Sequence, residues 1–522
     1  MKRIGKPYII FLFLFISVVI NLGLQTPFGT NSSFIYIALI SFFSIPIFYH
    51  ISFSPTKTES IVILLGLAIV GQILVIDPIE PGLYGKDSYD NLERLYILYS
   101  NSIDTVKLLQ LRGWPQLFIL SDILIKITTI DLELVAKYIP MLSLGIPPII
   151  YLYSYDLTGS KYISFLSGLA LLSSKTFLGF QTKFVPEFIG MLLFFTLLLV
   201  YSLRSTRVRW VIPILAAGIV LSHPIVAIAA MILIFSYITL YKWGRTQSLF
   251  YKYKPNNLGG LSVSISNIII FSSFFTFVYG FVITERVFMG VLATTYATEG
   301  YSAGIPRSAL HPNLLLADFG SLFVLITLSF CLLYGFFSSY QMSTWEMTFA
   351  TTSAVLSVYY AIEVLISIPF PLSGSRLLTY LVPLLFCSSI FVMFRIFGRT
   401  NIGFRRVSGI VLIIFIISQT MSIPYNVANS DPVYTVPGTE NHPTIGGRAA
   451  SDWAVEYSHN GIIEGKPKYV IRRGGLNNIN PTRCRFYERQ DIPKSINSDN
   501  SKSQYRPTYY DSGHIQISDC IR

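Results

Sequence analysis

Long apolar segments alternate with short polar loops along most of the chain. A helix of about 20 apolar residues crosses a bilayer, so each such segment predicts a transmembrane span. The expected spans cover roughly residues 8–22, 34–50, 60–76, 135–157, 162–180, 184–203, 210–223, 225–243, 264–283, 314–334, 346–368, 376–394 and 407–423. The pattern therefore predicts an all-α polytopic membrane protein with about 13 transmembrane helices.

Composition agrees with this class. The chain has 522 residues, of which 52% are hydrophobic and 13% are charged, and its mean hydropathy is +0.56. A soluble domain carries about 25% charged residues. The formal net charge of +12 would suggest a nucleic-acid partner in a soluble protein, whereas in a membrane protein the location of the basic residues indicates the topology.

Basic residues mark one alternate set of loops and the N-terminus. They are Lys2, Arg3, Lys6, Lys57, Lys161, Arg204, Arg207, Arg209, Lys242, Arg245, Lys252, Lys254, Arg395, Arg399, Arg405 and Arg406. Because basic loops face the cytoplasm, we expect a cytoplasmic N-terminus and an extracytoplasmic C-terminus in a multi-pass protein of the cell membrane. The first span has no small-residue cleavage site, and its removal would invert this topology, so we expect it to be retained.

The predicted external side receives three pieces: residues 77–134, 284–313 and everything after 424. We expect a transmembrane catalytic domain over 1–423 and a small extracytoplasmic α/β domain over 424–522. Within that domain, KYVIRR and HIQIS are strand-like. In the first loop, WPQLFILSDILIKIT is apolar but interrupted by Asp122 and Lys126, which favours a helix lying along the membrane surface.

Cysteine usage and sequence motifs exclude several classes of chemistry. Cys331 and Cys387 fall in expected spans, whereas Cys484 and Cys520 fall in the external tail, where an oxidising compartment would permit a disulfide. The sequence contains no CxxC, HExxH or Walker motif. We therefore expect no metal site, no cofactor and no coupling to nucleotide hydrolysis.

Charge is scarce in this chain, so the acidic cluster GKDSYDNLE at residues 85–93 is a candidate site. In a helical turn, Asp87 and Asp90 would share a face, where Asp87 could act as a general base and Asp90 could orient the acceptor or tune Asp87. The alternative is a hydrated loop in which both acids cap a helix. An acid cluster that directly follows a span and precedes an interfacial helix favours an enzyme working at the outer membrane surface.

The same region carries a family resemblance. An outward span, GKDSYDNL, RGWPQLF and the long segment KYIPMLSLGIPPIIYLYSY together resemble the first external loop of GT-C membrane glycosyltransferases, particularly archaeal ones. Further segments resemble the same family: FQTKFVPEFIG, LSHPIVA, PLSGSRLLTYLVPLL and the ending YYDSGHIQIS. The likeness extends over most of the chain.

The resemblance implies transfer of a sugar from a polyprenyl-phosphate-linked donor to an acceptor on the external face. On it, Asp87 matches the catalytic acid of the first loop, and Asp90 is its companion. The chain departs from the family in placing this loop after the third span, and it lacks the DxD pairs and the WWD-type motif of oligosaccharyltransferases. These departures favour glycosyl transfer other than oligosaccharide transfer to asparagine and weigh against a bound divalent metal.

A lipid-linked donor requires cationic groups at the outer interface. Arg376 begins an expected span just after PFPLSGS, where its guanidinium could bind two phosphate oxygens. Lys183 and Arg307 are further candidates for the same role. The alternative is an ordinary interfacial side chain that extends its charge to water.

Three further residues are expected to line this site. His223 precedes a proline at the outer end of a span and could face the acceptor or the phosphate, and Glu187 and Glu299 could each supply a second carboxylate. For each residue, the alternative is a structural role in a hydrated loop or an internal ion pair.

The sequence therefore predicts a GT-C-like integral membrane glycosyltransferase whose partners are a polyprenyl-phosphate-linked sugar, the bilayer and an acceptor protein, lipid or glycan. One alternative is a carrier or flippase of lipid-linked oligosaccharides, which would place polar groups near the bilayer midplane. Another is a polymerase or ligase of a surface polysaccharide, which would share the external site.

Overall fold

The computed structural model describes residues 32–76, 115–174, 183–202, 211–223 and 403–420, some single residues between these stretches, and four short strands after residue 462. The chain forms two compact units. The first comprises Met1–Ile79, Thr105–Leu120 and Pro140–Ala428, and the second comprises Glu80–Asp104, Ser121–Ile139 and Asn429–Arg522.

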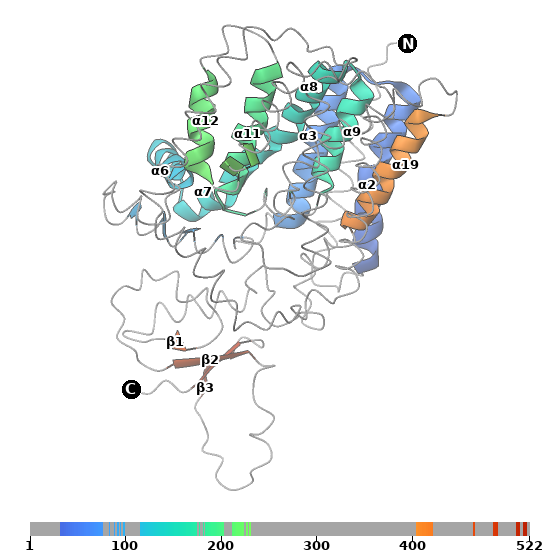
Figure 1. The fold of residues 1–522 in the computed structure, drawn as a ribbon. Coiled ribbons are helices and arrows are strands. Elements are labelled where there is room, and N and C mark those ends of the chain that lie inside the picture. The colour runs from blue at the N-terminus through green and yellow to red at the C-terminus, as the bar shows by residue number, and fades with distance from the viewer. Residues whose placement is uncertain are drawn as a thin grey trace, which may run out of the picture. The chain divides into compact units, whose positions relative to one another are not determined.

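The described part of the first unit is a bundle of apolar helices (Figure 1). Its helices are α2 (Ser32–Phe53), α3 (Lys57–Ile76), α8 (Ile146–Thr158), α9 (Lys161–Leu172), α11 (Glu187–Ser202), α12 (Val211–Ser222) and α19 (Phe404–Thr420). Consecutive helices joined by short turns run antiparallel, so α3 starts at the end of the bundle where α2 stops.

Short polar residues set where several of these helices begin and end. Thr56 and Glu59 form a reciprocal capping box at the start of α3: the Thr56 amide donates to the Glu59 carboxylate at 2.7 Å, and the Glu59 amide donates to the Thr56 hydroxyl at 3.2 Å. The Ser160 hydroxyl caps α9 by accepting the Ile163 amide at 3.3 Å. Gly159, with φ of 66°, ends α8 in the left-handed conformation.

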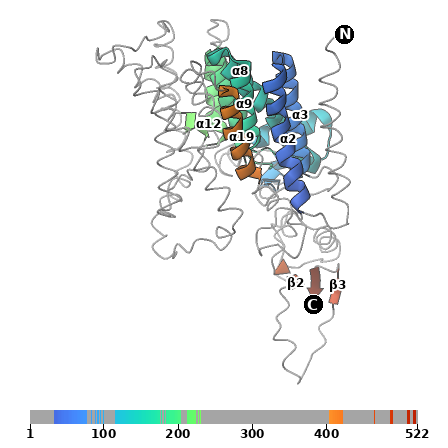
Figure 2. The ribbon, with the colours of Figure 1, turned by 90° about the vertical axis from the view of Figure 1, so that its right-hand side faces the viewer.

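Close helix packing in the core depends on small residues. A Cβ atom on Gly168 of α9 would lie 2.9 Å from Leu64 of α3, and one on Gly409 of α19 would lie 3.2 Å from Ile47 of α2. Figure 2 shows α19 alongside α2 and α9. The Ser408 hydroxyl of α19 donates to the Tyr162 hydroxyl of α9 at 3.3 Å, so a buried polar contact accompanies the apolar packing.

One continuous helical stretch in the described part of the chain, Leu132–Thr158, is long and apolar enough to cross a membrane. It consists of α7 (Leu132–Tyr138), the 3₁₀ segment η1 (Ile139–Gly145) and α8. It coincides with the expected span at 135–157, except that the expected single α-helix is interrupted. Pro140 and Pro147 lack amide hydrogens, which is consistent with a local change of helix type.

Other expected spans coincide with apolar helices, and one differs. The segments expected at 34–50, 60–76, 184–203, 210–223 and 407–423 are helical as α2, α3, α11, α12 and α19. The helix expected over 162–180 ends at Leu172, so that expectation was too long. Ser173 and Ser174 follow, and the Ser173 hydroxyl donates to the Ala170 carbonyl oxygen, which satisfies the backbone at the helix end. The remaining expected spans lie wholly or largely outside the described residues.

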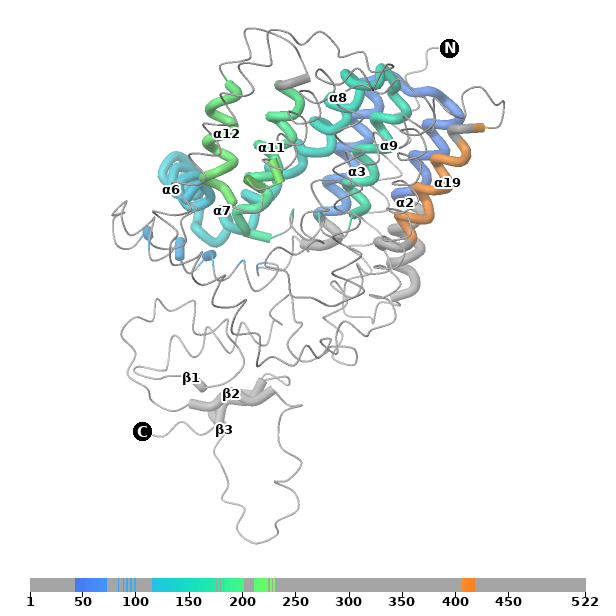
Figure 3. Tube along the Cα trace, viewed as in Figure 1, coloured from blue at the N-terminus to red at the C-terminus, as the bar shows by residue number. Residues whose placement is uncertain are grey.

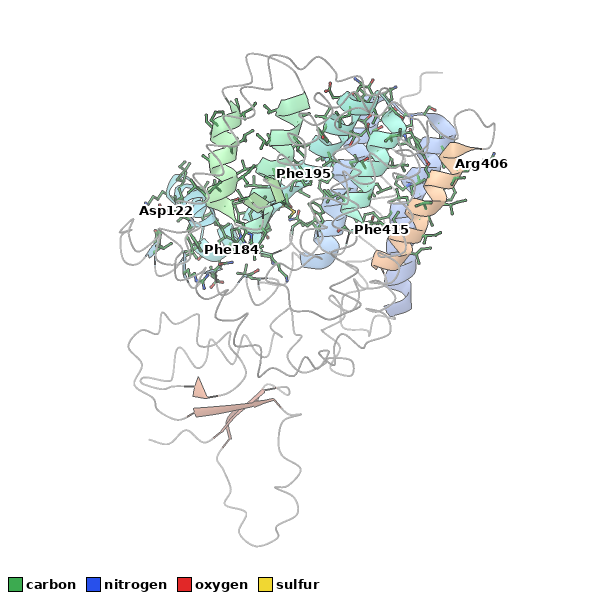
Figure 4. The ribbon with its side chains drawn as sticks, in the orientation of Figure 1. Asp122, Phe184, Phe195, Arg406 and Phe415 are labelled. Atoms are coloured by element: carbon green, nitrogen blue, oxygen red, sulfur yellow. The ribbon has the colours of Figure 1, made fainter. Side chains whose placement is uncertain are left out.

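The helix expected along the membrane surface is present as α6 (Gln116–Thr128). Ile123 and Ile127 are exposed on it whereas Ile125 is buried, so the helix is two-faced. Lys126 and Asp122 form an ion pair at 2.7 Å on its exposed side, and Asp122 is labelled in Figure 4. The location of α6 along a membrane surface stays a prediction.

The C-terminal part of the second unit contains a four-stranded sheet with strand order β1-β2-β4-β3. Its strands are β1 (Ile463–Glu464), β2 (Cys484–Glu488), β3 (Thr508–Asp511) and β4 (Ile515–Ser518). β2 and β3 both pair antiparallel with β4, and β1 pairs parallel with β2. The strand expected at HIQIS is observed as β4, whereas KYVIRR lies among the residues drawn in grey in Figure 3, outside the described ones.

Candidate functional site

Two ionisable side chains from different helices meet at one end of the bundle. The His223 Nε2 atom, just after α12, lies 3.3 Å from the Glu187 Oε1 atom at the start of α11, and each side chain is only 12% exposed. Burying a carboxylate is costly unless it is paired, and the imidazole supplies the partner. A carboxylate in this position also fixes the orientation of the imidazole ring.

The pair forms because α11 and α12 approach closely at Gly190, one turn after Glu187. A Cβ atom on Gly190 would lie 2.7 Å from the Ser222 hydroxyl and 2.7 Å from a methyl carbon of Val226. Ser222 and Val226 flank His223 in the sequence. Only a residue without a side chain therefore allows the two backbones to approach this closely.

Lys183 lies on the segment that leads into α11, at the same end of the bundle as Glu187. It is half-buried, and the neighbouring Phe184 and Val185 are buried. Its carbonyl oxygen accepts the Val185 amide at 2.9 Å, which makes a tight turn before the helix. The structure thus places a cationic residue on the turn immediately before the Glu187–His223 pair.

The described basic residues of the expected cytoplasmic loops lie at the opposite end of the bundle. Figure 4 shows Arg406 at one end and Phe184 at the other. The Lys57 ammonium lies 3.6 Å from the ring centroid of Tyr155, near the last turn of α8, which places the start of α3 at the Arg406 end. This separation of charge is what the predicted topology requires, although the orientation in a membrane remains a prediction.

Two buried carboxamides lie between the end of α3 and the segment before α11. The Gln72 side-chain amide donates to the backbone carbonyl oxygen of Gln181 at 2.9 Å, and both residues are buried from solvent. Sequence reasoning missed both residues and also Gly190. A single glutamine inside the apolar run of α3 was the available signal for Gln72, because a polar residue in such a segment is costly.

Of the residues predicted for the site, the structure describes Lys183, Glu187 and His223. It brings Glu187 and His223 into contact, and this confirms neither the functional nor the structural alternative. The other predicted residues, which are Asp87, Asp90, Glu299, Arg307 and Arg376, lie outside the described residues. Among the described residues, no group of three His, Cys, Asp or Glu side chains has the arrangement of a metal site.

Comparisons with known proteins give a likeness at the level of solved structures. No family model matches the chain, and no curated protein matches it. The oligosaccharyltransferase of Archaeoglobus fulgidus in its apo form is 14% identical, with a TM-score of 0.48, over 80% of this chain and 64% of that one. The same enzyme tethered through a disulfide bond to an acceptor peptide containing the NVT sequon is 12% identical, with a TM-score of 0.49, over 80% and 63% of the two chains. The chain thus spans less than two thirds of these neighbours, and at these values the likeness assigns no activity to it.

Proposed function

We propose that this protein is an integral membrane glycosyltransferase that transfers a sugar from a polyprenyl-phosphate-linked donor to an acceptor on the extracytoplasmic face. The observation that carries the proposal is the contact between Glu187 and His223 at 3.3 Å. These residues belong to FQTKFVPEFIG and LSHPIVA, two of the segments that resemble GT-C enzymes. Two segments chosen for their resemblance therefore contribute to one buried polar site.

The reaction needs a base for the acceptor and positive charge for the leaving group. When the acceptor oxygen or nitrogen attacks the anomeric carbon, the bond from that carbon to the phosphate oxygen breaks, and the lipid phosphate takes the electron pair. The acceptor proton passes to the base, for which we propose Asp87, with Asp90 beside it. Cationic and N–H donor groups stabilise the charge that develops on the phosphate.

Lys183 and His223 are the described residues that we propose for the phosphate side of the reaction. Lys183 supplies an ammonium group. Glu187 holds the His223 ring in a fixed orientation, and the protonated imidazolium, which carries two N–H groups, donates one to Glu187 and the other to the phosphate. Arg376 and Arg307 are proposed as additional phosphate ligands, and Glu299 as a further carboxylate near the acceptor. Each of these assignments requires that this end of the bundle faces the extracytoplasmic side.

The decisive experiment incubates the purified protein with radiolabelled polyprenyl-phosphate sugars, with and without a membrane extract as the source of acceptor. We expect label to leave the donor and to appear in extract material, and Glu187→Gln to lower that rate. Asp156→Asn is the matched control because Asp156 is an exposed carboxylate near the other end of the bundle.

A carrier or flippase would give a different result. It would move the labelled lipid across a vesicle bilayer without consuming it. Transport with no donor consumption under any acceptor condition would therefore overturn the proposal. A polymerase or ligase would consume the donor but place the label in polysaccharide, so the size of the labelled product identifies the acceptor class.

A further inference from the structure

The carboxamides of Gln72 and Gln181 contain buried polar atoms that the described part of the chain does not satisfy. Within the described part of the chain, the Gln72 Oε1 atom and both the Oε1 and Nε2 atoms of Gln181 have no hydrogen-bond partner. Gln181 is completely buried, and Gln72 is 2% exposed. A buried polar atom without a partner costs about 1 to 3 kcal/mol, so such groups require an explanation beyond packing.

The two residues are held together at one end of α3. The Gln72 Nε2 atom donates to the backbone carbonyl oxygen of Gln181 at 2.9 Å. Gln72 lies in the last part of α3, which leads into the segment that carries Asp87, and Gln181 lies just before Lys183 and Glu187. A ligand group bound by both carboxamides would therefore lie beside the segment that leads into Lys183 and Glu187.

The chemistry of the unpartnered atoms limits what such a group can be. Two of them, the Oε1 atoms, are acceptors, and the third, the Gln181 Nε2 atom, is a donor. A phosphate offers only acceptors at neutral pH and would be repelled by the two oxygen atoms. A hydroxyl group is neutral and has one donor and two acceptor positions, so two neighbouring hydroxyl groups of a sugar match this set: each donates to one Oε1 atom, and one of them accepts from the Gln181 Nε2 atom.

We propose that Gln72 and Gln181 bind two neighbouring hydroxyl groups of the sugar carried by the lipid donor and so determine which glycosylated lipid is accepted. This inference rests on the proposed function for the identity of the ligand. It adds a sugar subsite whose two proposed side chains are neutral carboxamides. In this subsite, the sugar supplies the hydrogen bonds that the three carboxamide atoms do not make with the described residues.

The test compares the affinity of the full-length protein in detergent for two probes, a polyprenyl phosphate and the same lipid carrying one hexose. The measured quantity is the ratio of the two dissociation constants across a panel of hexoses. For the preferred hexose, we expect wild type to bind the glycosylated lipid about 10-fold or more tightly, since each neutral hydrogen bond contributes about 1 kcal/mol. In Gln181→Met and Gln72→Met, the ratio should fall towards one while the affinity for the bare lipid phosphate is unchanged.

Two controls separate binding from folding. Gln181→Met should leave the thermal stability of the protein without lipid unchanged or higher, because the Gln181 side chain makes no hydrogen bond with the residues that the structure describes. A clear loss of stability would show a structural role and overturn the inference. Gln116→Met removes a third carboxamide, which lies next to Gly218 of α12 and whose Oε1 atom is also buried without a partner among the described residues; it should keep the wild-type ratio because only the Gln72–Gln181 pair is proposed to bind the sugar. If the ratio of the two dissociation constants fell as much in Gln116→Met as in Gln181→Met, the inference would also be overturned.

The outcomes distinguish this inference from the proposed function. A wild-type ratio near one for every hexose would mean that the carboxamides bind water only, and sugar transfer could still be observed separately. Sugar-dependent binding with no transfer to any acceptor would leave the subsite intact and remove the enzyme assignment.

Discussion

The imidazole Nε2 atom of His223 lies 3.3 Å from the carboxylate Oε1 atom of Glu187. His223 follows the C-terminal end of α12, and Glu187 begins α11 at its N-terminal end. The contact therefore joins the end of one helix to the start of the other. Gly190 permits it, because any larger residue would collide with Ser222 and Val226. The contact between the two side chains and the close packing of the helices are therefore one structural feature.

If Glu187 acts by orienting His223, the two residues should be energetically coupled in turnover. We expect Glu187→Gln and His223→Gln each to lower the transfer rate by about 10- to 100-fold, and the double variant to be little worse than either single one. Steady-state rates with the radiolabelled donor measure this. Strictly additive losses would mean that the residues act independently, and unchanged rates would return the pair to a structural role.

Gly190→Ala should force α11 and α12 apart. The new methyl group would lie 2.7 Å from the Ser222 hydroxyl, and we expect the free energy of unfolding to fall by about 1 to 3 kcal/mol, as in other overpacked sites. Thermal unfolding in detergent measures the change, and the transfer rate should fall with it because the pair separates.

The matched control for this substitution is Gly145→Ala. There the methyl group would meet only Leu192, at 3.8 Å, which is an ordinary contact. We expect stability to be unchanged or slightly raised, because alanine restricts the unfolded chain more than glycine does. Equal destabilisation by both substitutions would show that the close approach at Gly190 is not special.

Asp87→Asn should leave the protein folded and able to bind lipid but lower turnover by about 100-fold or more, as expected when a general base is removed. Asp90→Asn should cost less or act mainly on acceptor binding. Both positions lie outside the described residues, so kinetics are the direct test. Full activity of Asp87→Asn would remove it from the mechanism and favour the helix-capping alternative.

Arg376→Ala should weaken donor affinity by about 1.5 to 3 kcal/mol, the range for a hydrogen bond to a charged group. Arg376→Lys should restore it only in part, because an ammonium replaces the charge but not the two parallel donors of the guanidinium. Donor titrations of the two variants and wild type measure this. Equal affinities would make Arg376 an interfacial anchor and leave Lys183 and Arg307 as the phosphate ligands.

The predicted topology can be tested with single cysteines and an impermeant thiol reagent in intact cells. We expect Lys161→Cys and Arg207→Cys to be shielded and Ser430→Cys to be labelled, because basic loops face the cytoplasm. Background labelling of the four native cysteines is subtracted with wild type. Labelling of the first two variants would invert the topology, place Asp87 in the cytoplasm and point to a nucleotide-sugar donor instead.

The apolar pattern was sufficient to locate the helices that the structure describes. Long runs of apolar residues bury well only as helices, and capping residues such as Thr56, Glu59 and Ser160 act over one turn, so both signals are local in sequence. The prediction was wrong where nearby serine or proline residues ended the α-helix or changed its type. Ser173 and Ser174 ended α9 early, and the prolines at 140 and 147 accompany a 3₁₀ segment where one α-helix was expected.

The sequence by itself located the apolar helices, showed that basic residues mark one set of expected loops, and selected Glu187, Lys183 and His223 as candidates. Only the tertiary structure decided that Glu187 and His223 touch and that Gln72 reaches Gln181. The physical reason is that both contacts join segments distant in the chain, and their formation depends on the spacing between packed helices. The absence of a side chain at Gly190 sets that spacing. The sequence alone does not show this, because the glycine matters only once α12 packs against α11 at that point.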